Sequence, residues 1–355
     1  MRDLRDKGSR EAPGEGAQRL TKDSAIIPGP SRVSVVVPTW NGGARFRELL
    51  VALASQELDE GFELVVVDSS SADGTAEAAR AAGARVHSIP QSSFNHGGTR
   101  NLGISLASGD LVLLLTQDAL PVGPHYVASM VATFERANVD GVYARQVPRP
   151  DCDPILAERL RLWSASRSEP VLQVLAPGDA RASAALFARL PALERYLSCA
   201  FDNVASAVRR RTWERIPFPE RSFGEDVAWA REVLLSGGAV AYEPTAVVEH
   251  SHRIDMVREF KRLYCDHRNI IELFELRTVP SWKSVRGGWR GQVNVYRRLL
   301  DGQRLGRLER WYWRAYSVPY AFLEGAAQFL GARSHWKTEE SSFWRWFDRR
   351  VRKGV

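Results

Sequence analysis

Apolar residues in the first third of the chain form short runs, each followed by a polar turn and then by a stretch suited to a helix. Four such runs predict strands at residues 33–37, 62–67, 85–89 and 111–115. The intervening stretches predict helices at 44–56, in an Ala-rich segment that stops near Gly83, and at 97–108. This alternation favours an α/β fold with a mostly parallel sheet, in which ligands bind beyond the carboxyl ends of the strands.

The remaining chain is less regular. Further elements are predicted as a helix at 126–137, a strand at 141–147, a helix from Glu225 to about Leu235 and a strand at 240–248. Residues 151–200 mix helical stretches with Pro and Gly breaks and show no regular pattern. From about residue 255 the pattern is helical to the end, with breaks expected at Pro280, Gly287-Gly288 and Pro319.

The 355 residues are therefore divided into three segments. Residues 1–31 are charged and rich in Gly and Pro, which predicts a disordered leader and no targeting peptide. Residues 32–253 are expected to form the catalytic α/β domain, and residues 254–355 a helical region. No apolar run reaches the roughly 18–20 residues that span a bilayer. The three isolated cysteines lack CxxC spacing, which fits a reducing cytoplasm.

Charge and tryptophan are concentrated near the C-terminus. The chain carries a net charge of +7, but residues 281–355 hold 16 Lys and Arg against 6 Asp and Glu, together with 7 of the 11 tryptophans. This combination favours contact with an anionic membrane surface. The commoner alternative is a helical core with a solvated basic face. Binding of nucleic acid is a distant alternative, because no recognisable nucleic-acid module is present.

Polar residues follow the first two predicted strands. Thr39 and Asn41 come after the first strand, and Asp68 ends the second. A carboxylate at such a strand end can accept hydrogen bonds from a pyrimidine base or from ribose hydroxyls. Asp68 is equally compatible with a turn or a helix N-cap, since aspartate is common at both.

A glycine-rich segment precedes the helix predicted at 97–108. Gly97-Gly98 lets the backbone approach a ligand closely, and Arg100 offers a forked set of donors to a diphosphate. The alternative is a glycine-rich turn beside a solvated arginine. The segment matches neither a Walker A loop nor GxGxxG. A dinucleotide-dependent oxidoreductase is another alternative function. The absence of GxGxxG after the first strand argues against it.

Two further segments suggest a metal site. Asp118 follows the very apolar strand at 111–115, where it can hold Mg²⁺ or Mn²⁺ bound to a diphosphate. His250 and His252 would point to the same side of an extended segment, and either could complete the site. Asp118 could instead cap the next segment, and the histidines could be surface residues.

Two adjacent acids, Glu225 and Asp226, begin a predicted helix. The helix dipole alone could explain them, because it stabilises negative charge at an N-terminus. The functional alternative is a general base that accepts the proton of an acceptor hydroxyl.

The order and spacing of these segments, from about Val33 to His252, resemble the family 2 glycosyltransferases of the GT-A fold. The stretches at 94–101, 116–119 and 201–210 are similar to the rhamnosyltransferase branch of that family. The resemblance implies the following roles: nucleoside contact by Thr39, Asn41 and Asp68, further donor contacts by Arg100, Asn101 and Gln117, metal binding by Asp118 with His250 or His252, catalysis by Asp226, and acceptor-side positions at Asn203 and Glu225. Thr116 departs from the family, since it stands where many members have the first Asp of DxD.

The resemblance implies an inverting glycosyltransferase that uses Mg²⁺ or Mn²⁺. The expected donor is dTDP-L-rhamnose, and the expected acceptor is a lipid-linked or polysaccharide glycan of the cell surface. A UDP- or GDP-sugar donor is the alternative. The expected location is the cytoplasmic, inner face of the cell membrane, reached through the C-terminal region.

Overall fold

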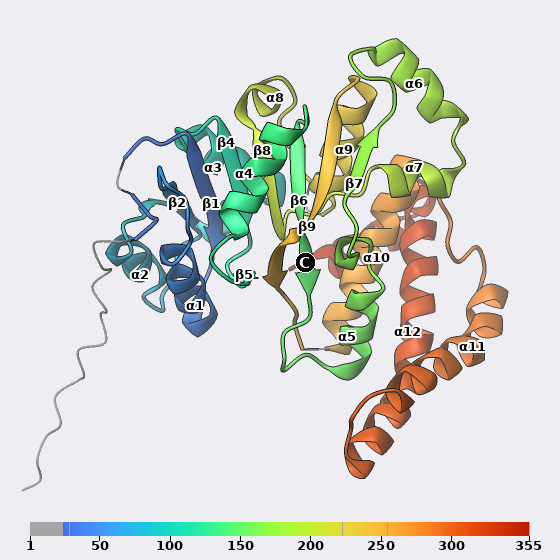
Figure 1. Cartoon of the computed structure of the whole chain (residues 1–355). Coiled ribbons are helices and arrows are strands. Elements are labelled where there is room, and N and C mark those ends of the chain that lie inside the picture. The colour runs from blue at the N-terminus through green and yellow to red at the C-terminus, as the bar shows by residue number, and fades with distance from the viewer. Residues whose placement is uncertain (1–23, 28, 222, 254, 355) are drawn as a thin grey trace, which may run out of the picture.

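A computed structural model describes residues 24–27, 29–221, 223–253 and 255–354 (Figure 1). Nine strands lie in these residues: β1 (Val33–Thr39), β2 (Glu63–Asp68), β3 (Arg85–Ser88), β4 (Leu111–Leu115), β5 (Leu120–Pro121), β6 (Gly141–Val147), β7 (Val171–Val174), β8 (Ala205–Arg209) and β9 (Ala239–Glu249). The helices of the sheet region are α1 (Gly43–Ala54), α2 (Thr75–Ala81), α3 (His96–Leu106), α4 (Tyr126–Arg136), α5 (Pro154–Arg161), α6 (Ala180–Arg189), α7 (Ala192–Ser198), α8 (Arg210–Arg215) and α9 (Glu225–Leu235). The C-terminal helices are α10 (Met256–Phe274), α11 (Trp282–Asp301), α12 (Arg307–Glu340) and α13 (Ser342–Arg352).

All the described strands belong to one sheet, in the order β3-β2-β1-β4-β8-β6-β9-β5, and β7 pairs with β9. The pairings from β3 to β4 and the β6–β9 pairing are parallel. Strand β8 is antiparallel to both β4 and β6, and the short β5 and β7 are antiparallel to β9. The α/β fold with a central sheet and a helical C-terminal region is confirmed. The strand ends of β1, β2 and β4 lie at one edge, as parallel strands require.

Helices cover both faces of the sheet because its central strands are apolar on both sides. Val35 and Val37 of β1 face one core, which α1, α2 and α4 complete, whereas Val36 faces a second core shared with α3 and α9. Helix α3 approaches β1 closely at Gly103, where an added Cβ would lie 2.3 Å from a methyl group of Val36. This close approach fixes the start of α3 relative to the strand ends.

The C-terminal helices form a separate layer that meets the sheet region at α5 and α7 (Figure 1). Helix α12 packs along α10 and α11, and α13 packs on α12 and α10. A core between α11 and α12 includes Tyr296, Trp313 and Tyr320, with Ile155 of α5 reaching into it from the sheet region. No helix in the described ranges combines the length and apolar character needed to cross a membrane.

The predicted elements of the sheet region are confirmed to within two residues at their ends. The break at Pro280 is confirmed, since it lies between α10 and α11. Two predicted breaks were wrong: α11 continues through Gly287-Gly288, and α12 continues through Pro319. Packing of α11 on α12 offsets these weak positions, and the indole of Trp289 donates to the carbonyl of Val318 at 2.7 Å.

The leader predicted for residues 1–31 falls mostly outside the described residues. The prediction of disorder is wrong for the last part of this segment, because Ala25 and Ile26 are buried. The Ala25 N–H donates to Ala54 O at 3.1 Å, and Ile26 forms a bridge with Phe62. Residues 25 and 26 therefore pack on the α/β domain, ahead of its predicted start at residue 32. The three cysteines are free.

Candidate active site

The loops that follow β1 and β2 are bonded to each other at the carboxyl edge of the sheet. The Thr39 hydroxyl donates to Asp68 Oδ1 at 2.8 Å, and the Ser71 hydroxyl donates to the same oxygen at 2.6 Å. Asn41 has a positive φ of 46°, and its Oδ1 accepts the Ala72 N–H at 2.9 Å. The predicted nucleoside-contacting residues Thr39, Asn41 and Asp68 therefore lie together in one rigid wall.

Gln117 contributes to the same wall. Its amide accepts the Trp40 N–H at 2.9 Å and donates to Trp40 O at 3.1 Å. This pair of bonds holds the loop after β1 against the loop after β4 and leaves the Trp40 indole half exposed. Gln117 thus shapes the predicted donor side through Trp40.

Asp118, His250 and His252 converge at this edge. His250 Nε2 lies 3.7 Å from Asp118 Oδ1, and His252 Nδ1 lies 3.5 Å from Asp118 Oδ2. One ligand atom from each residue falls within 4.8 Å of the others. Neighbouring ligand atoms that share an ion at about 2.0–2.2 Å lie roughly 3.0–3.5 Å apart, so the three side chains would have to move closer together to seat a divalent metal. The three residues fit the predicted metal site.

The electrostatics of this triad also suit a metal. Burial lowers the pKa of His250 to about 4, which outweighs the opposite effect of Asp118. Burial also lowers the pKa of His252. Neutral imidazoles have a lone pair available for a metal. Burial tends to raise the pKa of Asp118, but the two histidines and the nearby hydrogen-bond donors together lower it, so its carboxylate stays ionised.

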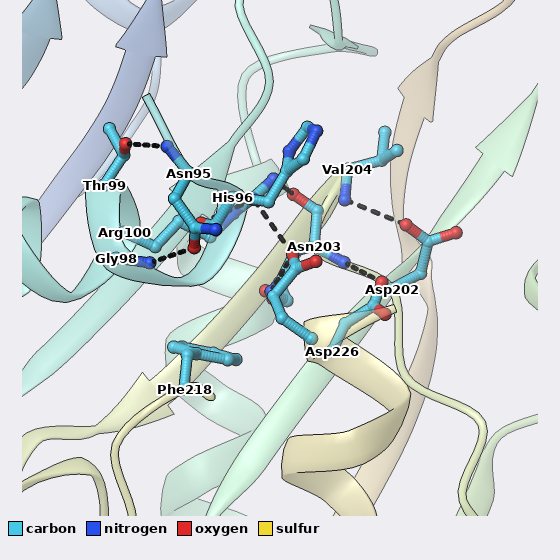
Figure 2. Close-up of polar contacts among 12 residues, drawn as sticks. Asn95, His96, Gly98, Thr99, Arg100, Asp202, Asn203, Val204, Phe218 and Asp226 are labelled. Atoms are coloured by element: carbon cyan, nitrogen blue, oxygen red, sulfur yellow. Dashed lines mark hydrogen bonds and ion pairs between the residues drawn. The ribbon is translucent and has the colours of Figure 1, made fainter. Parts of the chain in front are cut away.

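Asp226 lies in a second cluster of acids, at the start of α9 (Figure 2). Its Oδ2 accepts the Asn203 N–H at 3.3 Å, and its Oδ1 accepts the Val227 N–H at 2.8 Å. Burial raises the pKa of Asp226 well above its usual range, and the charges of Glu225 and Asp202 raise it further. A carboxylate with a raised pKa is a stronger base near neutral pH.

Arg100 has a different place from the one expected. Its guanidinium forms a buried ion pair with Glu225 Oε1 at 2.9 Å and donates to the carbonyls of His96 and Asn203, each at 3.2 Å. Figure 2 shows His96, Arg100 and Asn203 close together and near Asp226. The expected contact of Arg100 with a diphosphate is corrected here, because the protein itself occupies its terminal nitrogens.

Asn101 is corrected for the same reason. Its Nδ2 donates to Phe218 O at 2.8 Å, while its Oδ1 accepts the Trp213 indole N–H at 2.8 Å and the Phe218 N–H at 3.0 Å. Both polar atoms of the side chain therefore hold the chain after α8 in place. Asn101 faces the protein interior and not a ligand.

Asn203 and Glu225 lie next to the predicted base. Asn203 Nδ2 donates to Glu225 Oε1 at 3.2 Å, and Asn203 Oδ1 accepts the Ser206 hydroxyl at 2.8 Å. Both residues are buried. They act on the site by fixing the start of α9, and their direct contact with an acceptor stays a prediction.

Sequence reasoning missed three residues at the site. Asp202 accepts from Gln146 Nε2 at 2.6 Å, and burial raises its pKa beside Asp226. Arg149 donates to the Asp118 carbonyl at 3.1 Å. Asp202 directly precedes Asn203, so its position offered a signal, whereas nothing in the local sequence marked Gln146 or Arg149.

A triad that could hold a divalent metal and a buried acid cluster lie at the carboxyl edge of this α/β sheet, the edge at which such sheets bind ligands. The sequence profile described as Glycosyl transferase family 2 matches residues 34–189. An O-antigen chain rhamnosyltransferase of Salmonella typhimurium, RfbN, is 30% identical over 237 residues, which are 66% of this chain and 70% of the relative. The corresponding enzyme WbaN of Salmonella anatum is 32% identical over 235 residues, which are 65% and 70%. The chain belongs to glycosyltransferase family 2. This membership favours the glycosyltransferase hypothesis over the oxidoreductase and the nucleic-acid-binding protein.

Two solved structures are also similar. The mannosyltransferase PcManGT of Pyrobaculum calidifontis, in complex with GDP-Man and Mn²⁺, is 18% identical with a TM-score of 0.48, covering 94% of this chain and 89% of that one. Glucosyl-3-phosphoglycerate synthase of Mycobacterium tuberculosis, with Mn²⁺, UDP and its product, is 20% identical with a TM-score of 0.49, covering 76% and 87%.

Proposed function

We propose that this chain is an inverting, metal-dependent glycosyltransferase that transfers L-rhamnose from dTDP-L-rhamnose to a lipid-linked or polysaccharide acceptor. The observation that carries the proposal is the presence of the Asp118–His250–His252 triad and the Asp226 cluster at one edge of the sheet. The donor sugar is proposed from the two relatives named as rhamnosyltransferases. A UDP- or GDP-sugar remains the alternative donor.

The proposed reaction is a single displacement. Asp226 accepts the proton of an acceptor hydroxyl while that oxygen attacks the anomeric carbon of the donor. The bond from this carbon to the nucleoside diphosphate breaks on the opposite face, so the configuration inverts. A divalent ion at the triad would offset the charge of the departing diphosphate.

The remaining residues orient these groups. Thr39, Asn41 and Asp68 form the wall proposed to contact the nucleoside. Among the described residues, Asp68 Oδ2 accepts one protein N–H, from Ser71. A carboxylate oxygen has capacity for a second hydrogen bond, which a base N–H could fill. Arg100 keeps Glu225 ion-paired, whereas Asp202, the other acid beside Asp226, forms no ion pair in the described part of the chain and is held by hydrogen bonds from Gln146 and Val204.

The imidazole ligands favour Mn²⁺ over Mg²⁺ in this proposal. Mg²⁺ prefers oxygen ligands in near-ideal octahedral geometry, whereas imidazole binds later transition metals more readily. Two of the three proposed ligands are histidines, and one carboxylate is left where a DxD element supplies two. We therefore expect activity to be highest with Mn²⁺.

We further propose that residues 254–355 bind the anionic inner face of the cell membrane. Three large side chains near the start of α12 are strongly exposed: Leu308 at 86%, Trp311 at 72% and Tyr312 at 53%. Helix α13 adds exposed Phe343 and Trp346 beside several arginines. Aromatic and basic side chains of this kind suit the interface of an anionic bilayer.

One assay tests the proposed chemistry. Purified full-length protein is given dTDP-L-rhamnose and a membrane lipid extract, with Mn²⁺, Mg²⁺ or EDTA, beside a panel of UDP- and GDP-sugars. We expect dTDP release that needs metal and that Asp226→Asn abolishes. Glu339→Ala, on the exposed end of α12, is the control. Release from another donor would overturn the rhamnose assignment, and release by Asp226→Asn at the normal rate would overturn the base.

A further inference from the structure

A cavity of about 450 Å³ lies between the loop that follows β6 and the turn that joins α11 to α12. The catalytic region contributes Arg149, Asp151 and Arg161 to its lining, and the helical region contributes Leu305, Glu309 and Trp313. It therefore forms only where the C-terminal helices meet the sheet region. None of the roles proposed above uses this cavity.

The cavity adjoins the metal triad. Arg149, which lines it, donates through its guanidinium to the Asp118 carbonyl at 3.1 Å and through its backbone N–H to Ser251 Oγ at 3.2 Å. Ser251 stands between the two histidines of the triad. The His250 N–H donates to Val147 O at 3.0 Å, so the last residue of β6 touches the triad just before the cavity begins.

The cavity also adjoins the proposed base through the same strand. Gln146 of β6 donates to Asp202 in the acid cluster at 2.6 Å, and the lining of the cavity begins two residues later at Pro148. The end of β6 therefore links the acid cluster to the lining of the cavity. This is the layout that an acceptor longer than one sugar requires.

The chemistry of the lining suits a neutral, hydroxyl-rich ligand. Arg149 pairs with Glu48 and Asp151 with Arg45, so these charges largely offset each other. Glu309 is exposed and forms no hydrogen bond or ion pair within the part of the chain that the structure describes. The Glu309 carboxylate can accept hydrogen bonds from sugar hydroxyls, and the half-exposed guanidinium of Arg161 can donate to them. Leu305 and Trp313 offer apolar contact. The carboxylates disfavour a diphosphate.

We propose that this cavity binds the carbohydrate of the acceptor, as a neutral saccharide next to the sugar that is extended. The inference rests on the proposed transferase function and names a site for its second substrate. Leu308 and Trp311 lie beside Glu309 at the start of α12. The saccharide would thus be held next to the surface proposed to contact the membrane.

The test measures saccharide binding directly. Full-length protein with Mn²⁺ is examined by saturation-transfer NMR with methyl glycosides of α-L-rhamnose, α-D-mannose, α-D-galactose and β-D-N-acetylglucosamine. We expect at least one glycoside to bind. Leu305→Trp, which fills the cavity, should weaken that binding about tenfold or more, and Glu309→Ala by several-fold. Glu339→Ala, on the same helix outside the cavity, should leave it unchanged.

Nucleotide release from the donor panel, with the membrane lipid extract as acceptor source, is measured on the same samples and separates the two proposals. Failure of wild-type protein to release a nucleotide from any donor would refute the transferase function, while glycoside binding would still decide the cavity. The cavity proposal is overturned if no glycoside binds, if binding is equal in all variants, or if Leu305→Trp changes only the KM for the donor. If Leu305→Trp does not fold, Glu309→Ala decides.

Discussion

Replacement of Arg100 by Met tests whether this arginine holds the acid cluster together or binds the donor. The side chains of Arg100 and Glu225 are each only 6% exposed, and their ion pair measures 2.9 Å. Met keeps much of the apolar volume but leaves Glu225 buried and unpaired beside Asp226. Breaking one partner of a buried pair costs about 3–5 kcal/mol in the free energy of unfolding. For a chain of this length that is a fall in melting temperature on the order of 5–10 °C.

The assay is urea unfolding followed by tryptophan fluorescence, with dTDP binding measured by calorimetry. Arg32→Met is the matched control, because Arg32 and Glu135 form an exposed pair at 3.0 Å that is worth less than about 1 kcal/mol. The double variant Arg100→Met with Glu225→Leu should recover most of the lost stability, since it removes both charges. Normal stability with lost dTDP affinity in Arg100→Met would refute this account and restore the diphosphate role.

Three further outcomes are expected. Asp226→Asn should lower kcat by about 100-fold or more, and it should melt at a higher temperature than wild type at pH 8. Because folding raises the pKa of Asp226, ionising it costs stability as pH rises, so the two melting curves should converge at low pH. The acid limb of kcat/KM should lie above the ordinary aspartate pKa of about 3.9, and a limb at or below that value would exclude Asp226 as the base. Asp118→Ala or His250→Ala should weaken Mn²⁺ binding, measured by electron paramagnetic resonance, at least about tenfold; unchanged binding would remove the triad as the metal site.

The strand ends were predictable because their signals are local. Thr39, Asp68 and Asp118 each follow an apolar run, and parallel strands bring such residues to one edge. Arg100 and Asn101 were misjudged because their partners are distant: Glu225 lies 125 positions from Arg100, and Phe218 lies 117 from Asn101. A motif shows which residue types are present but not which of them the fold has already paired.

The predicted helix breaks at Gly287-Gly288 and Pro319 were wrong for a related reason. Gly and Pro weaken a helix locally, but α12 packs along most of α10 and α11, and burial of that surface outweighs the local cost at Pro319. The chain instead breaks at 302–306 and at Ser341. The first of these breaks forms one side of the cavity proposed to hold the acceptor, and no periodicity in the sequence marked it.

The insertion of β8 between β4 and β6 has a consequence for synthesis of the chain. Strands β3, β2, β1 and β4 can pair once Leu115 has been made, but β8 follows much later, and the other half of the sheet needs β9, which ends at Glu249. At roughly 5–20 residues per second, this interval lasts on the order of ten seconds. Throughout it, the wholly apolar β4 has an unpaired edge, which is the kind of surface that aggregates or recruits chaperones. The nascent chain is therefore most prone to aggregation after β4 and before β8 has been synthesised. At this stage the acid cluster and the two histidines have not yet been made.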